Sequence, residues 1–236
     1  SQGREINKNR LIALISAILI GEHPGATIVT DSITSSGLKD FIENKLGGHH
    51  HRFRRGYKNV INEAIRLNNE GVYCPLAIET SGHAAIKENY FLDDGAYLVT
   101  RLLIKMAQLK KEGKKLEDML SGLAEPKESM EFRMNITTED FKAYGQKVID
   151  ELTAYSKTAP GWHCAPDNHE GIRVSFDKND GDGWFLLRHS VHDPLMPLNI
   201  ESDSEGGVRI IAQKLCDFLE KYDSLDIAPL KAWLAK

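Results

Sequence analysis

The stretch "CPLAIETSGH" (residues 74–83) decides how the first half of the chain folds. Its apolar part, residues 74–80, predicts a buried strand, and two further runs predict strands at 26–31 and 49–55. Helical periodicity and capping residues predict helices at residues 8–21, 35–46, 57–71 and 93–113. Because helices and strands alternate at this spacing, we expect an α/β domain of three layers, with a mixed sheet between helices.

The second half of the chain follows a charged segment at 110–131. Such composition is typical of a domain boundary, so we expect a first domain at 1–112, a linker at 113–130 and a second domain at 131–236. Within the second domain, strands are predicted at 130–136, 171–177, 183–190 and 195–202, and helices at 137–156, at 206–222 and near the C-terminus. This order predicts an α+β domain, an antiparallel sheet with helices on one face.

Composition narrows the class of protein. The 236 residues are 41% hydrophobic and carry a net charge of −4, so we expect no basic surface for a nucleic acid or a membrane. The three cysteines are far apart and odd in number, with no C-x-x-C spacing, so the sequence suggests neither a zinc site nor a disulfide framework. The longest apolar run, residues 11–21, is about half the length that a membrane span requires. We therefore predict a cytoplasmic protein with no nucleic-acid partner and no membrane partner.

The residues after the apolar strand at 74–80 are candidates for ligand binding, because α/β folds place binding loops beyond the carboxyl ends of their strands. Glu79, Ser81 and His83 alternate, so an extended loop would place them on one side. A carboxylate, a hydroxyl and an imidazole suit paired sugar hydroxyls, which both donate and accept. A purely structural loop is the alternative. A serine hydrolase would need G-x-S-x-G, and Glu79 and His83 occupy its glycine positions.

A second polar run, "RHSVHDP" (188–194), comes at the end of an apolar strand. Arg188, Ser190 and His192 offer donors that could form an anion pocket with the backbone N–H groups of the loop. A Ser–His–Asp triad within one short run has poor geometry, because triad members converge from separate elements. Pro194 argues against a helix that would present the histidines to a metal. An arginine at a strand end, followed by a capped turn, is the alternative.

Two other polar runs predict structure and not metal sites. The run "NDGDGW" (179–184) lacks the EF-hand spacing and lies between two predicted strands, so it predicts a hairpin turn. In "GGHHHR" (47–52), neighbouring strand residues point to opposite faces, so at most His49 and His51 could share a ligand. We predict no metal site in this chain.

The two polar loops, in this order and roughly a hundred residues apart, resemble those of the α-D-phosphohexomutases, the phosphoglucomutases and phosphomannomutases. The third of the family's four domains has a sugar-binding loop of the form G-E-x-S-G-H, which "IETSGH" (78–83) matches except at Ile78. The fourth domain has a phosphate loop of the form R-x-S-G-T-E-P, and "RHSVHDP" keeps its Arg, Ser and Pro. The segment "FRRGYKNV" (53–60) resembles the loop that precedes the sugar loop, which implies that Gly56 and Tyr57 also lie at the sugar.

The chain departs from the family pattern at several positions. Val191 and His192 replace a Gly-Thr or Asn-Thr pair, and Asp193 replaces Glu. Tyr57 stands where some members have histidine. These changes keep the phosphosugar class and leave the preferred sugar open. The 236 residues also contain neither the T-A-S-H-N phosphoserine loop nor the D-G-D-x-D-R metal loop. The chain therefore resembles domains three and four truncated from a four-domain enzyme.

The resemblance implies a function in carbohydrate metabolism. The full-length parent would be an isomerase and intramolecular phosphotransferase, a phosphoprotein that interconverts hexose 1-phosphate and 6-phosphate through a phosphoserine, a bisphosphate and magnesium. We expect Mg²⁺ in the parent and none bound by this chain. Its partners would be the hexose phosphate and the missing N-terminal domains, without which we expect it to be inactive. The alternative is a stand-alone phosphosugar-binding or regulatory protein. The implied site residues are Glu79, Ser81, His83, Gly56 and Tyr57 for the sugar, His83 also as acid or base, and Arg188, Ser190 and His192 for phosphate.

Overall fold

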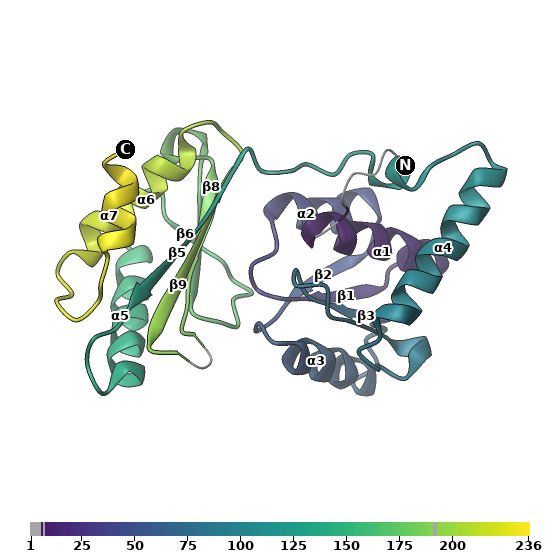
Figure 1. Cartoon of the computed structure of the whole chain (residues 1–236), viewed down its shortest axis with the longest axis horizontal. Coiled ribbons are helices and arrows are strands. Elements are labelled where there is room, and N and C mark those ends of the chain that lie inside the picture. Colours follow the sequence, from purple (N-terminus) through teal and green to yellow (C-terminus); the bar gives the residue numbers. More distant parts are fainter. Residues whose placement is uncertain (1–5, 7, 191–192) are drawn as a thin grey trace. The chain divides into compact units, whose positions relative to one another are not determined.

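The structure is a computed structural model that describes residues 6, 8–190 and 193–236. The chain forms two compact units, one ending at Glu125 and the other spanning Pro126–Lys236, and each is described by itself (Figure 1). The division between them falls inside the segment 113–130, for which a linker is predicted from the sequence.

The first unit is built on a four-stranded mixed sheet with the order β2-β1-β3-β4. Strand β1 (Thr27–Thr30) pairs in parallel with β2 (His49–Arg52) and with β3 (Leu76–Ile78). Strand β4 (Ala84–Ile86) pairs antiparallel to β3. The carboxyl ends of the three parallel strands therefore meet at one edge of the sheet, where polar loops follow each strand.

Helices cover both faces of this sheet, as Figure 1 shows. Helices α1 (Lys8–Glu22) and α2 (Ser36–Asp40), with the π-helix η1 (Phe41–Lys45), share one apolar core with Ile28. Helix α3 (Tyr57–Asn69) shares a separate core with Val29. Successive β1 side chains thus enter opposite cores, as strand geometry requires. The predicted three-layer α/β domain is confirmed.

The end of the first unit includes part of the predicted linker. Helix α4 (Gly95–Lys111) starts at Asp94, whose carboxylate accepts a hydrogen bond from the backbone N–H of Tyr97. The 3-10 helix η3 (Leu116–Leu120) follows, and Leu116 and Leu120 pack on the same core as α1. These residues therefore fold with the first unit.

The second unit is a five-stranded antiparallel sheet with the order β5-β9-β8-β7-β6. Its strands are β5 (Glu128–Asn135), β6 (His163–Cys164), β7 (Ile172–Phe176), β8 (Gly183–Leu187) and β9 (Leu195–Ser202). Helices α5 (Phe141–Ser156), α6 (Gly207–Leu219) and α7 (Ala228–Leu234) lie on one face and share a single core with it (Figure 1). The predicted α+β domain is confirmed. The predicted helix start at residue 137 is wrong, because Asp140 provides the N-cap by accepting from the backbone N–H of Ala143.

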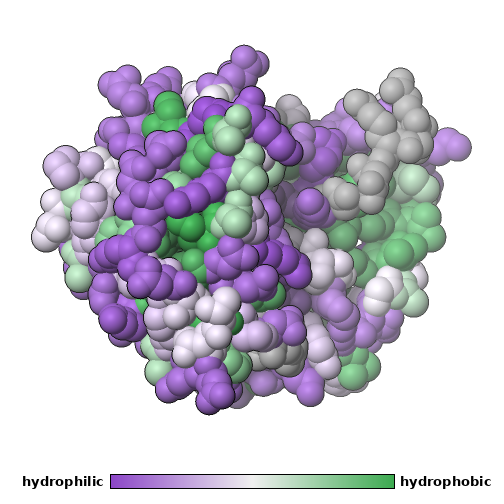
Figure 2. Space-filling view, turned by 60° about the vertical axis from the view of Figure 1, so that its left-hand side comes forward, coloured by the Kyte–Doolittle hydropathy of each residue, from purple (hydrophilic) through white to green (hydrophobic). Residues whose placement is uncertain are grey.

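The face of the molecule shown in Figure 2 is mostly polar. On the face shown in Figure 2, hydrophilic side chains surround smaller apolar areas. Across the described part of the chain, no helix combines the length and the apolar character needed to cross a membrane.

Candidate sugar and phosphate site

The sugar loop predicted at 79–83 is a tight hairpin turn between β3 and β4. The backbone N–H of Glu79 donates to the carbonyl oxygen of His83 at 2.9 Å, and that of Gly82 donates to the carbonyl oxygen of Glu79 at 3.0 Å. Gly82 has φ +98°, a conformation that favours glycine. The expected extended loop is therefore wrong, because β4 returns the chain antiparallel to β3 at once. As a result Glu79 is buried, whereas Ser81 and His83 are exposed.

Glu79 joins this hairpin to the loop before α3. Its Oε1 accepts a hydrogen bond from the backbone N–H of Gly56 at 2.6 Å. Its Oε2 accepts a longer bond, 3.5 Å, from the hydroxyl of Ser81. Gly56 is the N-cap of α3 and has φ +116°, so glycine suits this position. Three residues predicted for sugar binding thus meet at one buried carboxylate.

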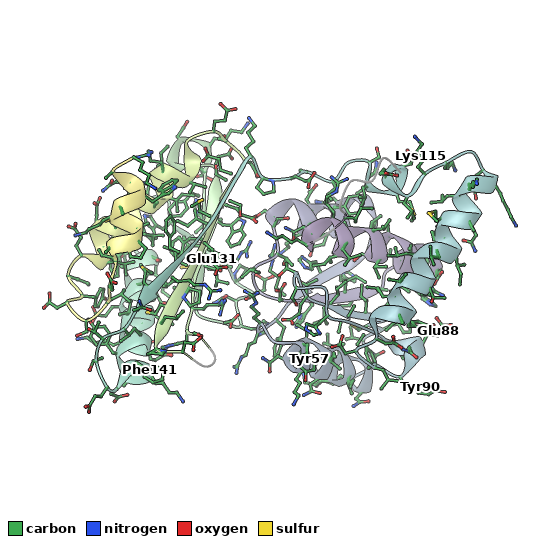
Figure 3. All side chains as sticks on the ribbon, in the orientation of Figure 1. Tyr57, Glu88, Tyr90, Lys115, Glu131 and Phe141 are labelled. Carbon is green, nitrogen blue, oxygen red and sulfur yellow. The ribbon has the colours of Figure 1, made fainter. Side chains whose placement is uncertain are left out.

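His83 and Tyr57 form the exposed side of the same cluster. The Nδ1 of His83 lies 2.6 Å from the carboxylate of Asp93. Its ring is stacked on Tyr57, with ring centroids 5.1 Å apart and planes inclined by 24°. Tyr57 is the first residue of α3, where Figure 3 labels it. All five residues predicted for the sugar therefore lie together, and the cluster adds Asp93, which the sequence indicates only as part of a helix start.

A buried carboxylate that the sequence did not single out lies beneath the hairpin. Asp31 follows β1 and is fully buried. Its carboxylate accepts from the Thr80 hydroxyl at 2.7 Å and from the Thr80 N–H at 3.3 Å. Burial raises the pKa of Asp31 to about 6; the Thr80 hydroxyl and then Arg55 oppose this rise, and the charge of Glu79 adds to it. In the sequence, Asp31 is the last residue of the strand predicted at 26–31, and a polar residue at that strand end is the feature that could have indicated it.

The predicted phosphate loop lies at the end of β8 in the second unit. Arg188 is buried, and its Nη1 donates to the carbonyl oxygen of His189 at 3.1 Å. The Ser190 hydroxyl accepts from the backbone N–H of Asp193 at 3.3 Å, and the Ser190 N–H donates to the carbonyl oxygen of Leu195 at 2.9 Å. The loop thus turns around Ser190. His192, predicted to bind phosphate, lies outside the described residues.

The other histidine of this loop has a packing role. His189 lies against α5 at Gly145, where an added Cβ would come within 2.4 Å of the His189 Cε1. Burial lowers the pKa of His189, which favours the neutral ring at pH 7. His189 therefore connects the phosphate loop to α5.

The other two polar runs, residues 47–52 and 179–184, are hydrogen-bonded to neighbouring parts of the fold. In β2, His50 Nε2 bonds the hydroxyl of Thr30 at 2.8 Å, and His51 Nε2 lies 2.9 Å from Glu63. In the turn between β7 and β8, the hydroxyl of Ser202 donates to the carbonyl oxygen of Gly181 at 2.6 Å. Among the residues that the structure describes, no three His, Cys, Asp or Glu side chains are arranged to hold a metal ion.

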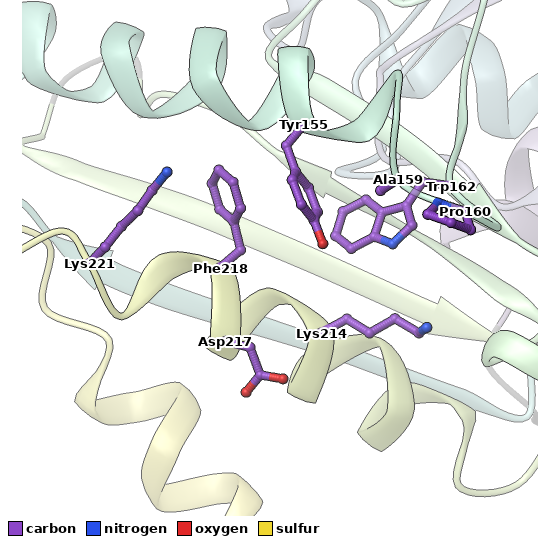
Figure 4. A pocket seen from close by; sticks show the side chains of 8 residues that line it. All are labelled: Tyr155, Ala159, Pro160, Trp162, Lys214, Asp217, Phe218 and Lys221. Carbon is purple, nitrogen blue, oxygen red and sulfur yellow. The ribbon is translucent and has the colours of Figure 1, made fainter.

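The second unit also has a pocket of about 490 Å³ (Figure 4). Two of its wall residues, Lys214 and Lys221, form ion pairs with Asp180 at 3.0 Å and with Glu151 at 3.2 Å. Its basic groups are therefore already neutralised, and it contains no residue predicted for sugar or phosphate. The lining residues are Tyr155, Ala159, Pro160, Trp162, Lys214, Asp217, Phe218 and Lys221.

Comparisons with known proteins point to one family. Residues 7–126 match the family model described as phosphoglucomutase/phosphomannomutase, alpha/beta/alpha domain III. The chain is 30% identical over 224 residues to a phosphomannomutase/phosphoglucomutase of Pseudomonas aeruginosa strain PAO1, a match that covers 94% of this chain and 44% of the relative. It is 26% identical to a phosphoglucomutase of Neisseria meningitidis, with 94% and 45% covered.

Solved structures agree with this match. A phosphoglucomutase/phosphomannomutase family protein from Burkholderia thailandensis superposes with a TM-score of 0.71 at 26% identity, covering 92% of this chain and 42% of that one. An N-acetylphosphoglucosamine mutase of Aspergillus fumigatus, at 14% identity and a TM-score of 0.60, shares the fold. The chain spans less than half the length of the curated relatives it matches. The family model matches more than half of this chain, and the chain therefore belongs to the α-D-phosphohexomutase family.

Proposed function

We propose that this chain provides the sugar-binding and phosphate-binding part of a phosphoglucomutase/phosphomannomutase that interconverts hexose 1-phosphate and 6-phosphate. The observation that carries the proposal is the buried Glu79 carboxylate, held at 2.6 Å by the Gly56 N–H beside Ser81 and His83. A carboxylate held this way keeps its orientation before a ligand arrives, which reduces the free-energy cost of binding.

The sugar hydroxyls bind to Glu79 and Ser81 in this proposal. Each carboxylate oxygen of Glu79 accepts one hydrogen bond within the protein and retains capacity for another. Two adjacent contacts of similar chemistry can hold either orientation of a hexose bisphosphate, as a mutase requires. Gly56 and Tyr57 complete the sugar side of the cluster.

His83 is proposed as the acid or base. Its Nδ1 faces Asp93, so the neutral ring donates its Nδ1–H to that carboxylate and keeps Nε2 as the acceptor. An imidazole oriented by a carboxylate is the arrangement that general-base histidines use.

Arg188, Ser190 and His192 are proposed to bind the phosphate that does not react. The guanidinium of Arg188 is permanently charged and planar, which suits a phosphate oxygen pair. Binding energy from a remote phosphate can orient the reacting end of a substrate.

The remaining machinery is assigned to other domains of the parent enzyme. The proposed cycle passes a phosphoryl group between an enzyme serine and the sugar through a bisphosphate, and the 236 residues lack the T-A-S-H-N loop for this step. Mg²⁺ would neutralise charge at the transferring phosphoryl group. We propose that other domains of the parent enzyme hold this ion. By itself, the chain is expected to bind and not to turn over.

Calorimetric titration tests the binding proposal. Glucose 1-phosphate and glucose 6-phosphate should bind the chain more tightly than glucose or inorganic phosphate alone. Glu79→Gln should weaken the sugar contribution and leave inorganic phosphate binding unchanged. If wild type and Glu79→Gln bind every ligand with equal affinity, the assignment of Glu79 is refuted. A coupled assay with Mg²⁺ should detect no interconversion by the chain; turnover would refute the proposed inactivity.

The alternative is a stand-alone phosphosugar-binding or regulatory protein. An antibody raised against this chain would separate the two, since a mutase parent should have about twice the mass of this chain, as its relatives do. A native protein of 236 residues would favour the binding protein. A serine hydrolase is less well supported, because the Ser81 hydroxyl is directed to Glu79, while the nearest partner of His83 is Asp93.

A further inference from the structure

We propose that Asp31 is a positioning residue that holds the 79–83 hairpin in its sugar-binding shape through Thr80. The inference rests on the proposed function of that hairpin and adds a residue from outside it. Asp31 touches no sugar in this proposal and acts only through the hairpin.

The geometry that carries the inference is the pairing of two strand ends. Strands β1 and β3 are parallel neighbours, so the residues that follow them meet at the same edge of the sheet. The carboxylate of Asp31 accepts a hydrogen bond from each donor of Thr80, from the hydroxyl at 2.7 Å and from the N–H at 3.3 Å. Thr80 lies between Glu79 and Ser81, so fixing its N–H and hydroxyl restrains the peptide groups of both sugar residues.

Hydrogen bonds also hold the backbone of Asp31 in place. Its carbonyl oxygen accepts from the hydroxyls of Thr30 and Thr34, both at 3.2 Å. Thr30 is bonded in turn to His50 at 2.8 Å, and Thr34 accepts from Arg52 at 3.1 Å. The contact of Asp31 with the hairpin is therefore anchored to β2 as well as to β1.

An ionised carboxylate is energetically unfavourable at a fully buried position such as that of Asp31. Burying an ionised group costs free energy unless hydrogen bonds compensate, and an apolar residue would fill the space without that cost. Perturbed buried carboxylates beside a binding loop are typical of functional sites. The retained charge thus has a use, the stronger hydrogen bonds that an ionised acceptor makes to Thr80.

This contact should depend on pH. The charged groups facing Asp31 are Glu79, which raises its pKa, and Arg55, which lowers it; burial is the largest influence and raises the pKa to about 6. Above pH 6 the ionised carboxylate accepts both bonds from Thr80. As the pH falls through 6, protonation removes one acceptor and weakens the hold on the hairpin.

The test compares the whole chain with its Asp31→Asn variant, a neutral side chain of the same shape. In the ligand-free chain, the amide nitrogen shift of Thr80 should titrate with a midpoint near pH 6, and this titration should be absent from the variant. Asp31→Asn should weaken glucose 1-phosphate binding roughly tenfold at pH 7.5, the scale of one charge-assisted hydrogen bond. The two proteins should bind equally at pH 5. Titration of the ligand phosphate affects both proteins alike and cancels in their ratio.

Two further variants control for a merely structural role. Thr80→Val removes the hydroxyl that donates to Asp31, so it should also weaken glucose 1-phosphate binding at pH 7.5. Adding Asp31→Asn to Thr80→Val should weaken binding little further. Ile15→Val trims a core side chain of α1 and should lower stability without changing the pH dependence of binding.

The outcomes distinguish this inference from the proposed function. No binding of glucose 1-phosphate by the wild-type chain would reject the sugar-binding function, and the Thr80 amide titration would still test the contact itself. A Thr80 amide whose titration is the same in wild type and Asp31→Asn, or equal affinities of the two proteins at pH 7.5, would overturn the role of Asp31.

Discussion

Replacing Asp31 by Asn should make the first unit more stable at neutral pH. The pKa of Asp31 is raised from 3.8 to about 6, so the folded unit holds its proton more tightly than the unfolded chain does. The contribution of Asp31 to the free energy of unfolding is therefore fully present below about pH 4 and is lost as the pH rises to about 6. At about 1.4 kcal/mol per pH unit, the loss is about 3 kcal/mol and stays constant above pH 6.

The variant lacks this pH dependence and loses part of the strength of its bonds to Thr80. A hydrogen bond to a charged group contributes about 1.5–3 kcal/mol, compared with about 1 kcal/mol for a neutral one. The raised pKa of Asp31 already includes the contribution of these bonds, so a neutral side chain of the same shape should gain about 3 kcal/mol in the free energy of unfolding at pH 7.5. At pH 4 we expect the variant to be equal to or slightly less stable than wild type.

Amide hydrogen exchange in β1 is the suitable assay. The exchange of Ile28 and Val29, which are fully buried, reports the opening of the first unit. All three tryptophans, Trp162, Trp184 and Trp233, belong to the second unit, so fluorescence follows that unit separately. If the free energies of unfolding of wild type and variant differ by the same amount at pH 4 and pH 7.5, the reasoning is refuted. The other titrating groups are present in both proteins, so their effects cancel in this difference.

Three further predictions concern the two loops. Gly56→Ala should lower the stability of the first unit by about 1–2 kcal/mol in urea unfolding, because φ is +116°, and should weaken glucose 1-phosphate binding by displacing the N–H from Glu79; unchanged binding would contradict that role of the N–H. Gly145→Ala should displace His189, whose Cε1 would lie 2.4 Å from the new Cβ, and weaken inorganic phosphate binding measured by calorimetry. Arg188→Ala should reduce phosphate affinity by about 1.5–3 kcal/mol, and a loss below 0.5 kcal/mol would argue against a direct contact.

The layers of the fold could be predicted because they depend on local patterns. Buried strands are short apolar runs, and the alternation of such runs with amphipathic helices determines the α/β class. The antiparallel strand β4 could not be predicted in this way. Its three residues, Ala84–Ile86, carry little pattern of their own, and they form a strand because β3 is next to them. Their pairing turns the expected extended loop into a hairpin.

The chemistry of the candidate site was only partly predictable, and for a related reason. The family motif contains Glu79, Ser81 and His83, so these residues could be selected from the sequence. Asp31 lies 49 residues from Thr80, and their contact depends on β1 and β3 being neighbours in the sheet. Strand order is a property of the folded unit that strand prediction does not contain. Asp93 was missed in the same way, because its contact with His83 depends on the chain returning beside β4, where Asp93 forms an antiparallel bridge with Ala85.

The most direct test of the central claim is a residue-resolved NMR titration of the chain with glucose 1-phosphate, glucose and inorganic phosphate. We predict that amides at 79–83 shift with glucose 1-phosphate and with high concentrations of glucose, and that the amides of Arg188 and Ser190 shift with glucose 1-phosphate and with inorganic phosphate. If the folded chain shows saturable shifts at neither loop, or only at residues elsewhere, its assignment as the sugar-binding and phosphate-binding part of a phosphohexomutase is wrong.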